Sequence, residues 1–171
     1  PRVDTVARDP FQWLRRNDQQ VEAAQLLTPA LRSTGLPRED ELAVRSALAE
    51  AWLLQDDLDQ AASALGRPPD TFRDTVPSRR LSTLWRLHGR LASARGDQSR
   101  AIGLLVRALK HAEAAHDSTG IGLAHYELGQ CYRQVGDLAI LREHITKAAS
   151  ALHAAGDRRH LALVHSLSGV S

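Results

Sequence analysis

Arg86 and Arg90 are the residues whose chemistry and spacing most directly suggest a binding site in this chain. They lie four positions apart, so they share one face of any helix that contains them. Guanidinium groups form charge-assisted hydrogen bonds with carboxylates and phosphates, often through two parallel contacts. The pair therefore predicts a surface that grips acidic or phosphorylated groups. The opposing interpretation is an ordinary solvated face, because charged side chains are the default on helix exteriors.

Eight histidines prompt a search for a metal site, but their spacing gives little support for one. His111 and His116, like His160 and His165, lie five residues apart, which places the members of each pair on different faces of a helix. No HExxH, CxxC or acid-rich ligand set accompanies them. We therefore expect neither a metal nor any other cofactor.

Catalytic motifs are absent from the sequence as well. It contains no G-x-S-x-G elbow and no glycine-rich phosphate loop. Cys131 is the single cysteine and has no evident activating partner, so we expect a small interior residue. The acid pair Asp56-Asp57 is best explained by helix capping and turn formation. The expectation is a protein without enzymatic activity.

Composition predicts an all-helical chain. Of the 171 residues 43% are hydrophobic, mostly Ala and Leu, and strand-length runs of β-branched or aromatic residues are absent. The net charge of +2 does not indicate direct nucleic-acid binding. No apolar run is long enough to cross a bilayer and no signal segment opens the chain, so we expect no membrane association. A single cysteine suits a reducing, cytoplasmic setting.

The sequence repeats itself at an interval of 40 residues. This interval joins Asp57, Asp97 and Asp137, and it joins Gly89 to Gly129. A fixed period of about 20–50 residues means that each unit is a module that buries its apolar face only by stacking on its neighbours. We expect one repeat domain over residues 1–171, part of a longer protein because methionine is absent. Its helix pairs should lie near 2–41, 42–81, 82–121 and 122–161, with the start of a further helix at 159–171.

The unit at 81–116 shows how each pair is built. Apolar residues recur at helical spacing up to Gly96-Asp97 and resume from Ala101. Glycine takes a positive φ at a helix end without a Cβ clash, and the following aspartate caps the next helix. The glycine and proline residues at 66–69 break this pattern, so residues 66–78 are expected to form a loop.

Three segments in phase resemble the tetratricopeptide pattern, W-x2-L-G-x2-Y followed by A-x3-F. They are Arg45-x2-Leu48-Ala49-x2-Trp52 with Ala61-x3-Leu65, Trp85-x2-His88-Gly89-x2-Ala92 with Ala101-x3-Leu105, and His125-x2-Leu128-Gly129-x2-Tyr132 with Leu141-x3-Ile145. His88 and Leu141 depart from the pattern, and the proline usual at the end of a unit is missing. The 40-residue length is similar to the extended repeats of LuxR-type regulators of the maltose-activator class and of bacterial peptide receptors.

The resemblance implies a right-handed α-solenoid of antiparallel helix pairs. Gly89 and Gly129 would lie where the two helices of a pair approach closely. The first helix of each pair would line a concave groove, and the resemblance places six residues there: Glu50, Arg86, Arg90, Tyr126, Gln130 and Arg133. The arginines would grip acidic groups, while Tyr126 and Gln130 would fix the backbone or an apolar side chain of the ligand. Where the chaperone-binding subclass has Asn, this chain has Glu50, Arg90 and Gln130, so recognition of chaperone tails is disfavoured.

The expected function is a non-enzymatic scaffold that binds a protein or peptide ligand, with acidic ligands favoured by the arginines. Such a scaffold could serve a bacterial transcriptional or signalling regulator. Two alternatives stay open at this point. One is a regulatory arm gated by a small molecule or signalling peptide, and the other is a structural spacer that self-associates.

Overall fold

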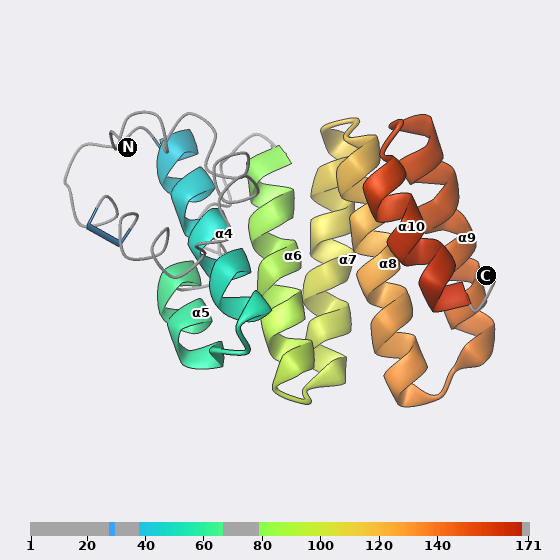
Figure 1. The fold of residues 1–171 in the computed structure, drawn as a ribbon, viewed down its shortest axis with the longest axis horizontal. Coiled ribbons are helices and arrows are strands. Elements are labelled where there is room, and N and C mark those ends of the chain that lie inside the picture. The colour runs from blue at the N-terminus through green and yellow to red at the C-terminus, as the bar shows by residue number, and fades with distance from the viewer. Residues whose placement is uncertain (1–27, 30–37, 67–78, 169–171) are drawn as a thin grey trace. The chain divides into compact units, whose positions relative to one another are not determined.

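The computed structural model describes residues 28–29, 38–66 and 79–168, which form helices joined by short turns (Figure 1). These residues contain no β-strand, so the all-α class predicted from composition is confirmed. The chain divides into two compact units, residues 1–71 and 72–171. A single repeat domain over 1–171 stays a prediction.

The described part of the N-terminal unit contains one helix pair. Helix α4 (Arg38–Leu54) packs against α5 (Leu58–Leu65). Arg45 ties the two helices together, because its Nη1 donates to the Ala64 carbonyl oxygen at 3.2 Å. The Nε of the same guanidinium donates to Glu41 Oε1 at 2.8 Å, which holds the side chain in place along α4.

Two predictions fall largely outside the described residues. Gly66 ends α5 with a φ of 67°, so the predicted helix end is confirmed there. The remainder of the predicted loop, residues 67–78, is not described. Of the helix pair predicted near residues 2–41, the structure describes Thr28 and Pro29 and residues 38–41, which begin α4.

The C-terminal unit is a stack of antiparallel helix pairs, as the 40-residue period predicts (Figure 1). Its first pair is α6 (Arg79–Ala94) with α7 (Gln98–Ala114), and its second is α8 (Ser118–Val135) with α9 (Leu138–Ala154). Helix α10 (Arg158–Ser168) packs against α9. Because α6 also contacts α8, successive pairs meet through their first helices as well. We call α6, α8 and α10 the first helices, and α7 and α9 the second helices.

The core of this unit lies between the pairs. One apolar cluster combines side chains of α6, α7 and α8, with Trp85, Leu105 and Leu128 among its members. A second cluster is centred on α9 and includes Leu152, and Val164 of α10 completes it. Each cluster draws on three helices, so no single pair buries its own apolar face.

Five interhelix turns in the described residues share one construction. A residue with positive φ comes first, and it is a glycine in three of the turns, Asp56 in one and His116 in another. An aspartate follows, and its backbone N–H donates to the carbonyl oxygen five residues earlier at 2.9–3.0 Å. This is the Schellman arrangement, which satisfies carbonyl groups at the helix end. The turns within pairs and between pairs are therefore alike.

The aspartates of these turns cap the next helix, with one exception. Asp57, Asp97 and Asp137 each accept a hydrogen bond at 3.0 Å from the backbone N–H three residues later, which confirms the capping role predicted for Asp97. Asp117 makes no side-chain cap bond and is buried. Its Oδ2 lies 3.2 Å from Arg79 Nε, so Asp117 links the start of α8 to α6.

Glycines occupy the closest contacts between paired helices. A Cβ on Gly89 would lie 2.7 Å from Leu105 Cγ on α7, so the predicted close approach is confirmed. Gly129 is less tightly placed, at 3.3 Å from the nearest side-chain atom of α9. The closest approach is at Gly122, which the sequence analysis did not single out. A Cβ there would lie 2.5 Å from Leu152 Cγ.

Candidate interaction site

Arg86 lies inside the C-terminal unit, where it forms an ion pair with Glu127. Its Nη1 is 2.5 Å from Glu127 Oε1, and the two side chains are 8% and 11% exposed. Because Arg86 is on α6 and Glu127 on α8, the pair joins the first helices of successive repeats. The resemblance placed Arg86 on an open groove surface, whereas the structure buries it. The reason is the carboxylate of Glu127, which the sequence analysis did not consider.

Arg90 lies one helical turn after Arg86 and remains partly open to solvent. Its Nε is 3.7 Å from the same Glu127 Oε1, and its side chain is 28% exposed. Two guanidinium groups thus converge on one carboxylate oxygen. Arg86 is buried, whereas the positively charged Arg90 is partly exposed at the surface.

Tyr126 and Gln130 form an ordered polar pair on α8. Gln130 Nε2 donates to Tyr126 Oη at 2.9 Å, and both side chains are half-buried. The Tyr126 ring packs against the apolar cluster of α9 and α10. Gln130 occupies the position equivalent to Arg90, 40 residues later, so the two residues present their polar groups from neighbouring first helices.

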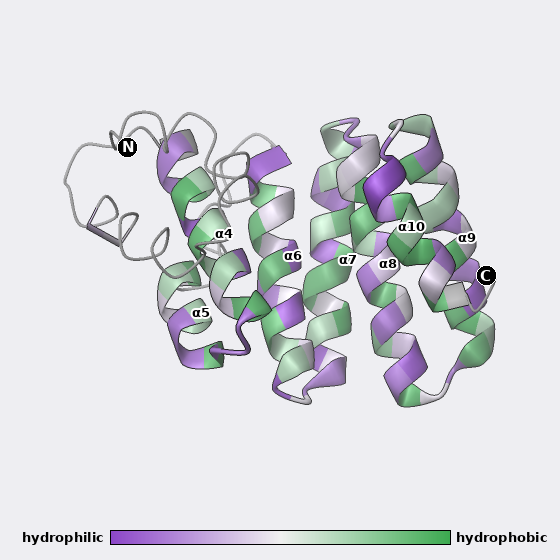
Figure 2. Cartoon of the chain, in the orientation of Figure 1, coloured by the Kyte–Doolittle hydropathy of each residue, from purple (hydrophilic) through white to green (hydrophobic). Residues whose placement is uncertain are grey.

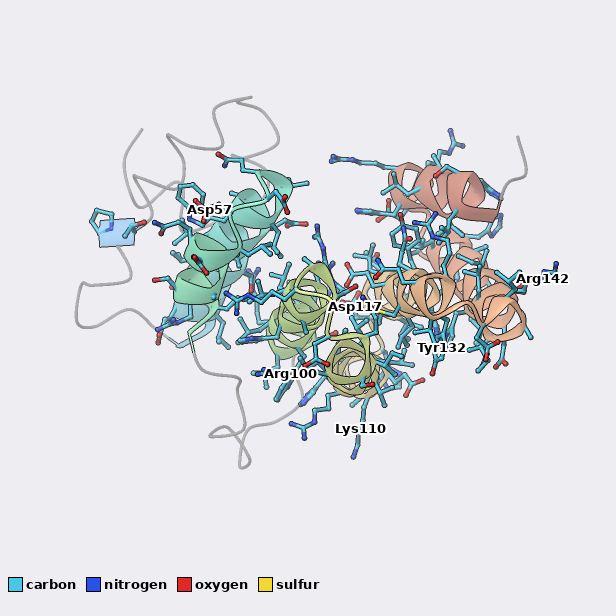
Figure 3. The ribbon with its side chains drawn as sticks, turned by 90° about the horizontal axis from the view of Figure 1, so that it is seen from below. Asp57, Arg100, Lys110, Asp117, Tyr132 and Arg142 are labelled. Atoms are coloured by element: carbon cyan, nitrogen blue, oxygen red, sulfur yellow. The ribbon has the colours of Figure 1, made fainter. Side chains whose placement is uncertain are left out.

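The other two predicted site residues belong to different units of the chain. Arg133 is exposed near the C-terminal end of α8, and Glu50 is half-buried on α4 of the N-terminal unit. The structure therefore brings together Arg90, Tyr126 and Gln130 on first helices in contact, with Arg86 buried below them. On the second helices, Lys110 and Arg142 point outward (Figure 3).

The positions of Thr119, Leu123 and Tyr126 recur on all three first helices, and the position of Gln130 recurs on α6 as Arg90. Spacings of four, three and four residues keep a set of positions on one helix face. We call this set the first-helix face: Arg79, Thr83, Arg86 and Arg90 on α6; Thr119, Leu123, Tyr126 and Gln130 on α8; and Arg159, Leu163 and Ser166 on α10. Within it Arg79, Arg159, Leu163 and Ser166 are exposed. The contribution of α10 was not predicted, although the 40-residue period extended past residue 160 indicates it.

His125 and His144 make a polar contact inside the α8–α9 pair. Their Nδ1 atoms are 2.9 Å apart, and the ring of Tyr132 stacks on His144 with 5.4 Å between centroids. Burial lowers the pKa of His125 to about 4, helped by His144 and by Lys147 and opposed by Glu143. Burial also lowers the pKa of His144. At neutral pH both rings are therefore uncharged, and one Nδ1 donates to the other.

Two further kinds of site were sought in the described residues, a metal site and a reactive thiol. No three His, Cys, Asp or Glu side chains come together there in a group that could hold a metal ion. Cys131 is buried, as predicted, and burial raises the pKa of its thiol, which stays protonated at neutral pH. None of the described helices combines the length and the apolar character needed to cross a bilayer.

No protein-family model matches this sequence, and no curated protein is significantly similar to it. The fold and the site define a class, an all-α protein of stacked helix pairs. The tetratricopeptide resemblance and the activity that it implies therefore stay predictions.

Proposed function

We propose that this protein is a non-enzymatic interaction module of the tetratricopeptide type, which binds a protein or peptide on its first-helix face. The Tyr126–Gln130 pair beside Arg90 carries the proposal. An ordered hydroxyl and amide and a partly exposed guanidinium lie on two first helices that contact each other. Amide and hydroxyl groups suit a peptide backbone, and a guanidinium suits a carboxylate.

The contacts of the polar groups on this face also support binding. Tyr126 packs on the apolar cluster of α9 and α10, and its hydroxyl accepts a hydrogen bond from Gln130. Groups fixed before a ligand arrives lose little conformational entropy when it binds. A preorganised polar surface is therefore better suited to recognition than flexible charged side chains of the same type.

The setting of the module is the second part of the proposal. Repeats of 40 residues are similar to those of LuxR-type regulators and bacterial peptide receptors. The module would accordingly act in the cytoplasm as the interaction or sensory part of a transcriptional or signalling regulator.

A displayed library of random peptides, selected on the immobilised wild-type protein, tests the binding surface. The face variant is Tyr126→Phe with Gln130→Ala, which removes the hydrogen-bonding groups and keeps the aromatic packing. The matched control is Thr146→Ala with Ser150→Ala, which removes two exposed hydroxyls from α9. We expect selected peptides to bind the control like the wild type and the face variant at least tenfold more weakly. Equal affinity for all three proteins would exclude the face as the binding site.

A further inference from the structure

On the three first helices of the C-terminal unit, positively charged residues far outnumber negatively charged ones. Helix α6 has four arginines, α8 has one and α10 has two, while Glu127 is their single acidic residue. The N-terminal turns of α6 and α10 are hydrophilic (Figure 2). Since Glu127 lies against Arg86, the exposed charge on these helices is positive. A surface of one sign favours partners of the opposite sign and speeds their approach.

Three cations belong to the first-helix face itself and reach solvent. Arg79 has a side chain that is 73% exposed, although its Nε lies near Asp117. Arg90 is partly exposed one turn beyond the buried pair, and Arg159 is exposed at the start of α10. The cations therefore come from α6 and α10, on either side of the polar groups of α8.

The same face has an apolar component. Leu123 on α8 is half-buried, and Leu163, at the equivalent position on α10, is 46% exposed. Tyr126 of α8 packs against the apolar cluster of α9 that includes Val164 of α10, so both helices contribute to one core. Burying apolar surface is worth about 25 cal/mol per Å². A partner that covers both leucines would bind more tightly through burial of apolar surface, in addition to its attraction to the arginines.

We propose that the partner is an acidic, amphipathic segment of another protein, whose carboxylates contact Arg90 and Arg159 and whose apolar side chains cover Leu123 and Leu163. This inference rests on the proposed function and names the chemistry of its ligand. A nucleic acid would use the cations and leave the leucines exposed. An amphipathic acidic segment uses both sets of residues, and it also offers a backbone to Tyr126 and Gln130.

The test uses peptides selected from the displayed random library, each with a fluorescent label, and four variants of the full chain. Arg159→Glu reverses one charge of the face, and Leu163→Asp removes its most exposed leucine. The matched controls are on α7: Lys110→Glu reverses an exposed charge, and Val106→Asp replaces a side chain that is 52% exposed. All four positions are on the surface, and thermal unfolding verifies that each variant is folded.

We expect the selected peptides to be enriched in Asp or Glu together with Leu, Ile or Phe. Their affinity should fall at least tenfold for Arg159→Glu and for Leu163→Asp, and less than twofold for the two α7 controls. Affinity should also fall as NaCl rises from 50 to 500 mM, because salt screens exposed charges.

Four results would overturn the inference. If binding depends on Tyr126 and Gln130 but tolerates Arg159→Glu and Leu163→Asp, the ligand chemistry is wrong and the proposed function stands. If the selection enriches no peptide, both this inference and the proposed function are wrong. If single-stranded DNA or anionic vesicles bind in place of peptides, and bind less to Arg159→Glu, the partner belongs to another class. If the chain alone forms dimers by sedimentation that Leu163→Asp abolishes, a second copy occupies the face.

Discussion

Arg86 of α6 and Glu127 of α8 form a buried ion pair between the first helices of successive repeats, with 2.5 Å between Nη1 and Oε1. Removing two charges from water is costly, so such a pair adds little net stability compared with well-packed apolar residues. The pair instead opposes movement of one helix relative to the other, because a buried charge without its counter-charge strongly lowers the free energy of unfolding. Sliding α6 along α8 would separate the charges, so the pair favours one alignment of the repeats.

Replacement of Arg86 tests this coupling. Arg86→Met leaves the carboxylate of Glu127 in a buried site without its closest cation, and we expect the free energy of unfolding to fall by about 3 kcal/mol. The double variant Arg86→Met with Glu127→Met removes both charges and should recover most of that loss. Urea denaturation of the wild type, both single variants and the double variant measures the interaction. A double variant that loses the sum of the single effects would show that the pair is not coupled.

The glycines of paired helices offer a second test. Gly122→Ala places a Cβ 2.5 Å from Leu152 Cγ, and such overpacking typically costs about 1–3 kcal/mol. Gly129→Ala meets its nearest neighbour at 3.3 Å and should cost less. Gly103 is the control, because it lies within α7 with open space around it, and alanine is the better helix former there by up to about 1 kcal/mol.

Thermal unfolding should therefore rank the four proteins in the order Gly103→Ala, wild type, Gly129→Ala and Gly122→Ala, from most to least stable. A Gly122→Ala variant as stable as wild type would mean that α8 and α9 separate easily to make room.

The unfolding free energy should depend on pH through the buried histidines. The pKa of His125 is about 4 in the fold and about 6.5 when unfolded, so folding favours the neutral ring. This stabilisation is complete above pH 6.5 and is lost as the pH falls from 6.5 towards 4. Between pH 7 and pH 5 the loss for His125 is about 2 kcal/mol. Burial also lowers the pKa of His88 to about 4, which adds a change of the same sign.

Urea denaturation at pH 7, 6 and 5 measures this dependence. His125→Gln cannot take up a proton and should show a shallower fall in stability than the wild type. His153→Gln, which changes an exposed histidine of α9, is the control and should follow the wild type. Parallel curves for all three proteins would exclude His125 as a source of the pH dependence.

Most of the scaffold follows from local sequence rules. The helix end at Gly96 and the cap at Asp97 depend on residues within one turn, and both occur as predicted. The approach at Gly89 follows from the absence of a side chain at a repeated position. Such features are readable because the interacting groups are close in sequence or fixed by the period.

The site was less predictable, because it depends on how far each helix is rotated toward its neighbours. Arg86 and Tyr126 are equivalent by the 40-residue period, and the charge of Arg86 suggested exposure. Tyr126 was likewise assigned to the groove surface, and its ring is half-buried. The contact of His125 with His144 similarly depends on the relative rotation of α8 and α9, which neither residue type reveals.

Two of the turn aspartates, Asp117 and Asp137, follow a residue of positive φ in turns of the same construction but have different side-chain partners. Asp137 caps α9 through a hydrogen bond with the Ile140 N–H, so Asp137→Ala should cost about 1 kcal/mol and Asp137→Asn should restore most of it. Asp117 instead pairs its buried carboxylate with Arg79, so Asp117→Asn, which lacks the charge, should be no more stable than Asp117→Ala. Urea denaturation of the four variants distinguishes the two roles. Rescue by asparagine at both positions would show that Asp117 acts as an ordinary cap.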